Sequence, residues 1–140
     1  MAESTPALTF GRTNYRAALM WLSAINVLAV LLLAVLGGRF FITPTIIDIH
    51  GYIANVVFLT FIGQAGLLFM SKPGGRYGML LLGLSLVSVV LVMAQIGLGY
   101  SGRESSTALS LHIPNGVLIC AIAAAVLSQL PYARTRADGA

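Results

Sequence analysis

Four long apolar runs make up most of this chain of 140 residues. They cover about residues 17–36, 45–70, 77–100 and 107–130, with short polar segments between them. Each run is about as long as the roughly 20 apolar residues that an α-helix needs to cross a bilayer. Charged residues make up only 9% of the chain, against about a quarter in soluble domains. We therefore predict one all-α domain, residues 1–140, in which four transmembrane helices form a bundle in a lipid bilayer, with short flexible tails.

The positions of the basic residues predict the orientation of this bundle. Arg39 and Arg103 lie in the loops after the first and third runs, whereas the other six basic residues lie before the first run, between the second and third, or after the fourth: Arg12, Arg16, Lys72, Arg76, Arg134 and Arg136. Because arginine and lysine collect in cytoplasmic segments, we expect both termini to be cytoplasmic. The basic residues form no patch that would favour a nucleic-acid partner.

Two histidines are the most informative residues in this apolar background. His50 and His112 are each the sixth residue of a run that begins on the outer side. An ionisable side chain in a membrane helix is costly and usually faces the bundle interior. A pair of neutral imidazoles from facing helices can supply both axial ligands of a haem iron. We predict that the two histidines bind one haem b; the alternative is that they are hydrogen-bonded packing residues.

Several other residues are candidates for the same site. Ala54 and Gly116 lie four residues after the histidines and leave space either for a porphyrin edge or for close helix packing. Arg39 and Arg103 are expected on the same side as the histidines, where they could pair with the haem carboxylates or be ordinary interfacial arginines. We also expect inward-facing stripes on the first and third helices: Ser23, Asn26, Ala34 and Gly37, and Ser85, Ser88, Gln95 and Gly99.

The two halves of the chain are weakly alike. Gly38-Arg39 precedes His50 and Gly102-Arg103 precedes His112, each by about ten residues. A duplicated hairpin would have a pseudo-two-fold axis along the membrane normal, with one ligand on each side of a central cofactor. The two Gly-Arg pairs alone do not establish a duplication. Pro114 is expected near the first turn of the last helix, or else as a kink beside His112.

Two short segments of the sequence are similar to a known family. Gln95-Ile-Gly-Leu-Gly99, a short loop and Leu111-His112, with His50 at the start of the second run, resemble one half of haem A synthase. The resemblance implies a four-helix bundle whose second and fourth helices ligate haem. Where that family has Glu-x-x-His-Arg, this chain has Ile47 and Gly51 in place of the glutamate and the arginine, so the resemblance implies haem binding without haem A synthesis. The chain also resembles small four-helix bacterial membrane proteins of unassigned function, which implies the bacterial inner membrane.

The residue types that are missing argue against several other functions. The helix centres carry no carboxylate for ion-coupled transport, and the sequence has too few ligands for structural zinc and no phosphate-binding loop. A stand-alone enzyme is therefore not expected. A haem with both axial positions filled favours electron transfer or haem handling, with a respiratory or other membrane complex as partner. The alternative is a cofactor-free accessory or assembly subunit that packs through its small-residue faces.

Overall fold

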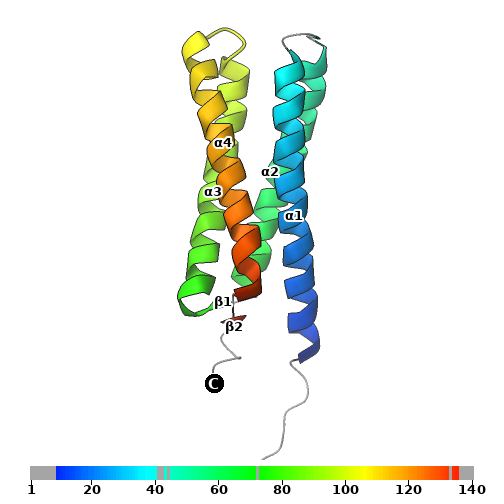
Figure 1. Cartoon of the computed structure of the whole chain (residues 1–140), viewed down its shortest axis with the longest axis vertical. Coiled ribbons are helices and arrows are strands. Elements are labelled where there is room, and N and C mark those ends of the chain that lie inside the picture. The colour runs from blue at the N-terminus through cyan, green and yellow to red at the C-terminus, as the bar shows by residue number, and fades with distance from the viewer. Residues whose placement is uncertain (1–8, 41–42, 44, 72, 133, 136–140) are drawn as a thin grey trace, which may run out of the picture.

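The computed structural model describes residues 9–40, 43, 45–71, 73–132 and 134–135. Four helices form an antiparallel bundle (Figure 1): α1 (Thr9–Phe40), α2 (Ile46–Met70), α3 (Gly75–Ser101) and α4 (Ser106–Gln129). Each contains a candidate membrane span of 24 or 25 residues. At about 1.5 Å per residue such a span exceeds the roughly 30 Å of a bilayer's hydrocarbon core. The predicted all-α architecture of four helices, each long and apolar enough to cross a membrane, is confirmed.

The helix ends agree with the apolar runs except in α1. The other three helices begin and end within two residues of the predicted limits. Helix α1 already includes residues 9–15 of the segment 1–15 for which the sequence predicts a flexible tail, and residues 1–8 of that segment lie outside the described part. The helix also continues through Gly37 and Gly38, where the sequence predicts a break. A glycine inside a helix costs only about 1 kcal/mol relative to alanine, while each added residue continues the hydrogen-bond ladder. Those two predictions are therefore wrong.

Short contacts close the end of the bundle at which the described chain begins and ends, which we call the termini end. After α4, the 3-10 turn η1 (Leu130–Tyr132) leads to strand β2 (Arg134–Thr135), which pairs antiparallel with β1 (Pro73–Gly74) in the α2–α3 turn. Arg16 Nη2 donates a hydrogen bond to the Pro131 carbonyl at 2.7 Å. We call the opposite end, with the α1–α2 and α3–α4 loops, the loop end. There Ser105 Oγ caps α4 by accepting from the Ala108 backbone N–H at 3.3 Å.

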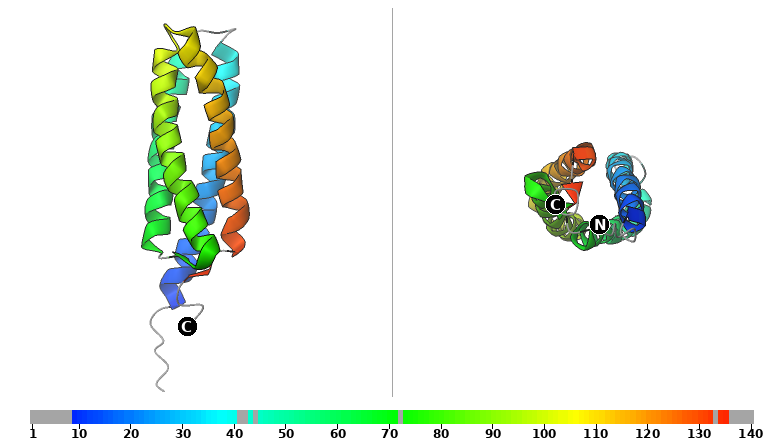
Figure 2. Two further views of the ribbon diagram at one scale, coloured as in Figure 1. Left: turned by 90° about the vertical axis from the view of Figure 1, so that its left-hand side faces the viewer. Right: turned by 90° about the horizontal axis from the view of Figure 1, so that it is seen from below.

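The helices follow one another around the bundle, so that α1 and α3 each pack against α2 and α4 (Figure 2). Two apolar clusters fill the core, one around Leu68 near the termini end and one around Phe61 near the middle. Between them lies a layer of buried polar side chains. Its members on α1 and α3 confirm half of the predicted inward stripes: Ser23, Asn26, Ser85 and Ser88. Ala34 is exposed, so that part of the prediction is wrong.

A constant separation of 62 residues relates most of the buried positions of the two hairpins. The related pairs are Leu19 and Leu81, Ser23 and Ser85, Asn26 and Ser88, Val57 and Ile119, Phe61 and Ala123, Gln64 and Val126, and Leu68 and Leu130. The same separation relates the two histidines, since 112 − 50 = 62. The α1–α2 and α3–α4 hairpins are therefore equivalent halves about a pseudo-two-fold axis along the bundle. The two Gly-Arg pairs are not equivalent positions, since 103 − 39 = 64.

Candidate functional site

The bundle is less tightly packed toward the loop end, where the histidines lie. No described side chain within residues 31–39, 46–56, 93–101 and 106–118 is buried. The inward positions there, including both histidines, remain half-buried. Over the same part, the two hairpins diverge from each other (Figure 1). The side chains at the level of the histidines are therefore less buried than those of the polar layer and of the two apolar clusters.

The two imidazoles approach each other in this loosely packed part of the bundle. Their ring centres are 6.3 Å apart and their planes are tilted by 49°. His50 is the fifth residue of α2 and His112 the seventh of α4. Their positions along the helices thus differ slightly, but the structure brings the two predicted ligands together at one level of the bundle.

Each imidazole lies against a glycine on the other helix of its own hairpin. A Cβ atom added at Gly99 would lie 3.0 Å from His112 Cε1, and one at Gly37 would lie 3.5 Å from His50 Cε1. A side chain at Gly99 would therefore displace the His112 ring, whereas a methyl group at Gly37 would be in ordinary contact. Since Gly37 and Gly99 are also separated by 62 residues, the histidine–glycine contact is part of the internal repeat.

The Nδ1 atoms of the two rings differ in their hydrogen bonding. His112 Nδ1 donates to the Gln95 carbonyl at 3.0 Å. Because a carbonyl only accepts, a neutral His112 carries its proton on Nδ1 and keeps a lone pair on Nε2. Histidines that bind metal commonly donate their other ring N–H to a backbone carbonyl, as His112 does. His50 Nδ1, by contrast, is buried without a hydrogen-bond partner.

The surroundings of His112 are more polar than those of His50. Asn115 Nδ2 donates to the Gln95 side-chain oxygen at 2.6 Å and to the Leu91 carbonyl at 3.0 Å. A Cβ atom added at Gly116 would lie 3.0 Å from Gln95 Nε2. Gly116, expected to leave room for a porphyrin edge, thus makes room for the Gln95 amide. In the first hairpin the positions equivalent to Gln95 and Asn115 are Leu33 and Ile53, which lack amides.

Pro114 interrupts the hydrogen-bond ladder of α4 close to His112. It is the ninth residue of the helix, so the prediction that it lies in the first turn is wrong. Proline has no backbone N–H and cannot donate a hydrogen bond to the Ser110 carbonyl, four residues earlier. The helix is consequently less constrained immediately after the histidine.

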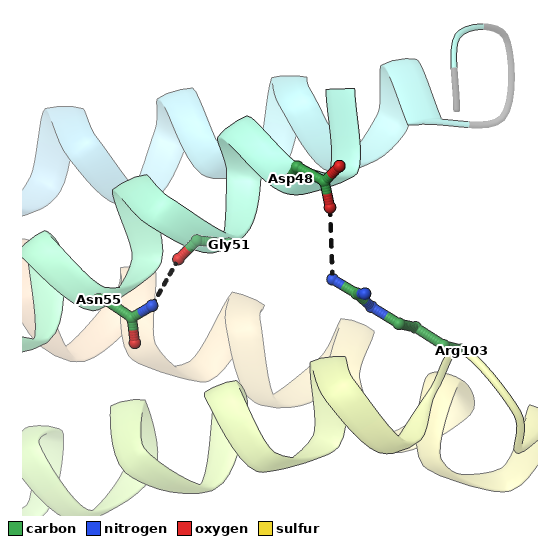
Figure 3. A network of polar contacts seen from close by, with 4 residues as sticks. All are labelled: Asp48, Gly51, Asn55 and Arg103. Carbon is green, nitrogen blue, oxygen red and sulfur yellow. Dashed lines mark hydrogen bonds and ion pairs between the residues drawn. The ribbon is translucent and has the colours of Figure 1, made fainter. Parts of the chain in front are cut away.

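The remaining predicted residues are spread around this region. Arg103, in the α3–α4 loop, places Nη2 3.9 Å from Asp48 Oδ1 on α2 (Figure 3), and its guanidinium lies 5.3 Å from the centre of the Tyr100 ring. Arg39 is exposed in the last turn of α1 and forms no ion pair with a described residue. Ala54 is half-buried on α2, one turn from His50.

A pocket of about 210 Å³ lies beside Arg103 at the loop end, between α2 and α3. We call it the rim pocket, and it is lined by Asp48, Gly51, Tyr52, Tyr100 and Arg103. Sequence reasoning did not identify the rim pocket, nor the contact of His50 with Gly37. The constant spacing of 62 residues was the available signal for that contact, because it relates Gly37 to Gly99 and His50 to His112.

Within the described part of the chain, no group of three or more histidine, cysteine, aspartate or glutamate side chains could hold a metal ion. No family model, curated protein or solved structure matches this chain. The two imidazoles, with Gly37 and Gly99 behind them, form the candidate functional site.

Proposed function

We propose that this protein resides in the bacterial inner membrane and holds one haem b between His50 and His112, serving electron transfer or haem handling. The spacing of the two imidazoles carries the proposal. A metal–imidazole bond is about 2.0 Å long, and in a five-membered ring with bonds of about 1.3 Å each atom lies about 1.1 Å from the centre. Two imidazoles on opposite sides of one metal ion therefore have centres about 6 Å apart, close to the 6.3 Å separation in the structure.

The surroundings of the histidines also suit a haem. Gly37 and Gly99 allow each ring to lie back against its own hairpin, and the side chains between the hairpins leave this level only half-buried. The proton on His112 Nδ1 leaves Nε2 free to coordinate iron. When bound, haem supplies a one-electron couple, and two imidazole ligands leave its iron no open position, which favours electron transfer over oxygen chemistry.

The distribution of charge supports a membrane location with cytoplasmic termini. The antiparallel arrangement brings the termini end together with the α2–α3 turn, and these segments carry six of the eight basic residues. Lys72 and Arg136, two of the six, lie outside the described residues. The loop end carries Arg39 and Arg103 and would face the outside. On this orientation the proposed haem lies near the outer surface, where a respiratory or other membrane complex could exchange electrons with it.

The absorption spectrum of the protein purified from haem-sufficient cells tests the proposal. We expect a Soret band with sharp low-spin features, and we expect His50→Ala and His112→Ala each to lose them. Asn55→Ala is the matched control, because Asn55 is a polar residue of α2 that is exposed and bonded to its own helix. A colourless wild-type protein that also takes up no added haem would overturn the proposal and favour a cofactor-free accessory or assembly subunit.

A further inference from the structure

The ion pair at the rim pocket is loose and easily exchanged. Arg103 and Asp48 approach to 3.9 Å, and their side chains are 46% and 70% exposed, respectively. An ion pair this long and this exposed contributes little to stability. Arg103 can therefore release Asp48 for another carboxylate at small cost, especially for one that it binds through two parallel hydrogen bonds.

The rim pocket also breaks the symmetry of the two hairpins. The positions equivalent to Asp48, Gly51 and Tyr52 are Ser110, Ile113 and Pro114, and the position equivalent to Tyr100 is Gly38. These four residues carry no charge. The α2–α3 side of the loop end thus has a cation, a carboxylate and two phenol rings, whereas the α4–α1 side has none of these at the equivalent positions.

The rim pocket lies at the level of the histidines and has room for a ligand group. Asp48 and Gly51 are within one helical turn of His50, so they differ from it in depth by only a few ångströms. A Cβ atom added at Gly51 would meet nothing within 4 Å, and the pocket volume is about 210 Å³. A planar group held between the histidines could therefore extend an edge toward Arg103.

We propose that the carboxylate edge of the bound haem faces the α2–α3 side and that one haem carboxylate replaces Asp48 as the ionic partner of Arg103. This inference rests on the proposed haem site. In the proposed site the apolar macrocycle lies between the apolar hairpins, while its two carboxylates require water or a cation. The rim pocket offers both, whereas the equivalent positions Gly38, Ser110, Ile113 and Pro114 offer no charged group, and this difference favours one orientation of the ring. Asp48 holds Arg103 across the two hairpins until haem takes its place.

Titration of the haem-free protein with haem and with haem dimethyl ester, followed by Soret absorption, tests this inference. The ester has the same iron and ring but no charged carboxylates. We expect the wild type to bind haem about tenfold more tightly than the ester, because a hydrogen bond to a charged group contributes about that much. Arg103→Gln should lose this preference by weakening the binding of haem alone. Asp48→Asn should bind haem several-fold more tightly and the ester unchanged, because the competing carboxylate is gone.

Arg39→Gln is the matched control, since Arg39 is the other loop-end arginine and has no described ionic partner. It should keep the full preference for haem over the ester. If Arg103→Gln keeps the preference, or if Arg39→Gln loses it instead, the proposed orientation is wrong although the histidine site stands. If the wild type binds neither compound, the haem site itself is refuted and this inference with it.

Discussion

The side chain of Gln64 joins the two hairpins through hydrogen bonds that one substitution can remove. Ser23 Oγ and Asn26 Nδ2 donate to its oxygen at 3.0 and 2.8 Å, and its Nε2 donates to Ser85 Oγ at 3.2 Å. Ser23 and Ser85 are equivalent residues of the two hairpins, so one amide bridges the same position in both. Gln64 is 1% exposed, which leaves water little access to these groups.

We expect Gln64→Leu to lower the free energy of unfolding by about 2–4 kcal/mol. Interhelical hydrogen bonds in membrane bundles contribute about 0.6 kcal/mol each on average, so three of them account for about 2 kcal/mol. The buried partners left without a hydrogen bond add to the loss. If Ser23 and Ser85 are also changed to alanine, part of the stability should return, because removing both partners of a hydrogen bond can be nearly neutral.

Unfolding of the purified protein in mixed micelles, with helical content followed by circular dichroism, measures these differences. Asn55→Leu is the control, because Asn55 is exposed and its amide donates to the Gly51 carbonyl of its own helix at 3.0 Å. We expect it to be as stable as the wild type. The reasoning fails if Gln64→Leu is equally stable, or if the triple variant is no more stable than Gln64→Leu alone.

Two further predictions follow from the histidine contacts and from the charge distribution. Gly99→Leu should lose haem absorption, because a Cβ atom there lies 3.0 Å from the His112 ring, whereas Gly83→Leu should keep it, because a Cβ atom at Gly83 meets nothing within 4 Å; an unchanged spectrum in purified Gly99→Leu would contradict the role given to this contact. With Cys120 replaced by alanine, a membrane-impermeant maleimide should label Glu104→Cys but not Arg76→Cys in intact cells, and the reverse labelling would show that the orientation is wrong.

The fold was largely predictable because each helix is encoded by a local run of apolar residues. Three helices end within two residues of those runs. Helix α1 extends beyond its apolar run at both ends, because neither the glycines after residue 36 nor the polar residues before residue 17 end it. In the structure, Gly37 stays helical and lies against the His50 ring. The local sequence does not distinguish a glycine that ends a helix from a glycine that stays helical and makes room for a side chain of a neighbouring helix.

The candidate site was predictable only in part, because it depends on which segments pack together. The matched depth of His50 and His112 could be recognised from their places in the two runs. The Asp48–Arg103 contact joins a helix to a distant loop, and no local pattern marks it. The Gly-Arg pairs pointed to a repeat in the wrong register, since they are 64 residues apart, whereas the buried positions are 62 apart.

The internal repeat is kept at the two histidines and broken at Gln64, and the proposed occupant of the histidine site accounts for the difference. A metal ion with two opposite imidazoles needs equivalent ligands from both hairpins, and His50 and His112 are equivalent. One amide, that of Gln64, bonds both Ser23 and Ser85, so the second hairpin needs no amide of its own. The equivalent of Gln64 is accordingly Val126. Since about 14 residues of α2 separate Gln64 from His50, roughly 21 Å along the helix, the two sites should be independent. Gln64→Leu should therefore lower stability while leaving the haem spectrum of the folded protein unchanged, and a shifted spectrum would show that the two ends of the bundle are coupled.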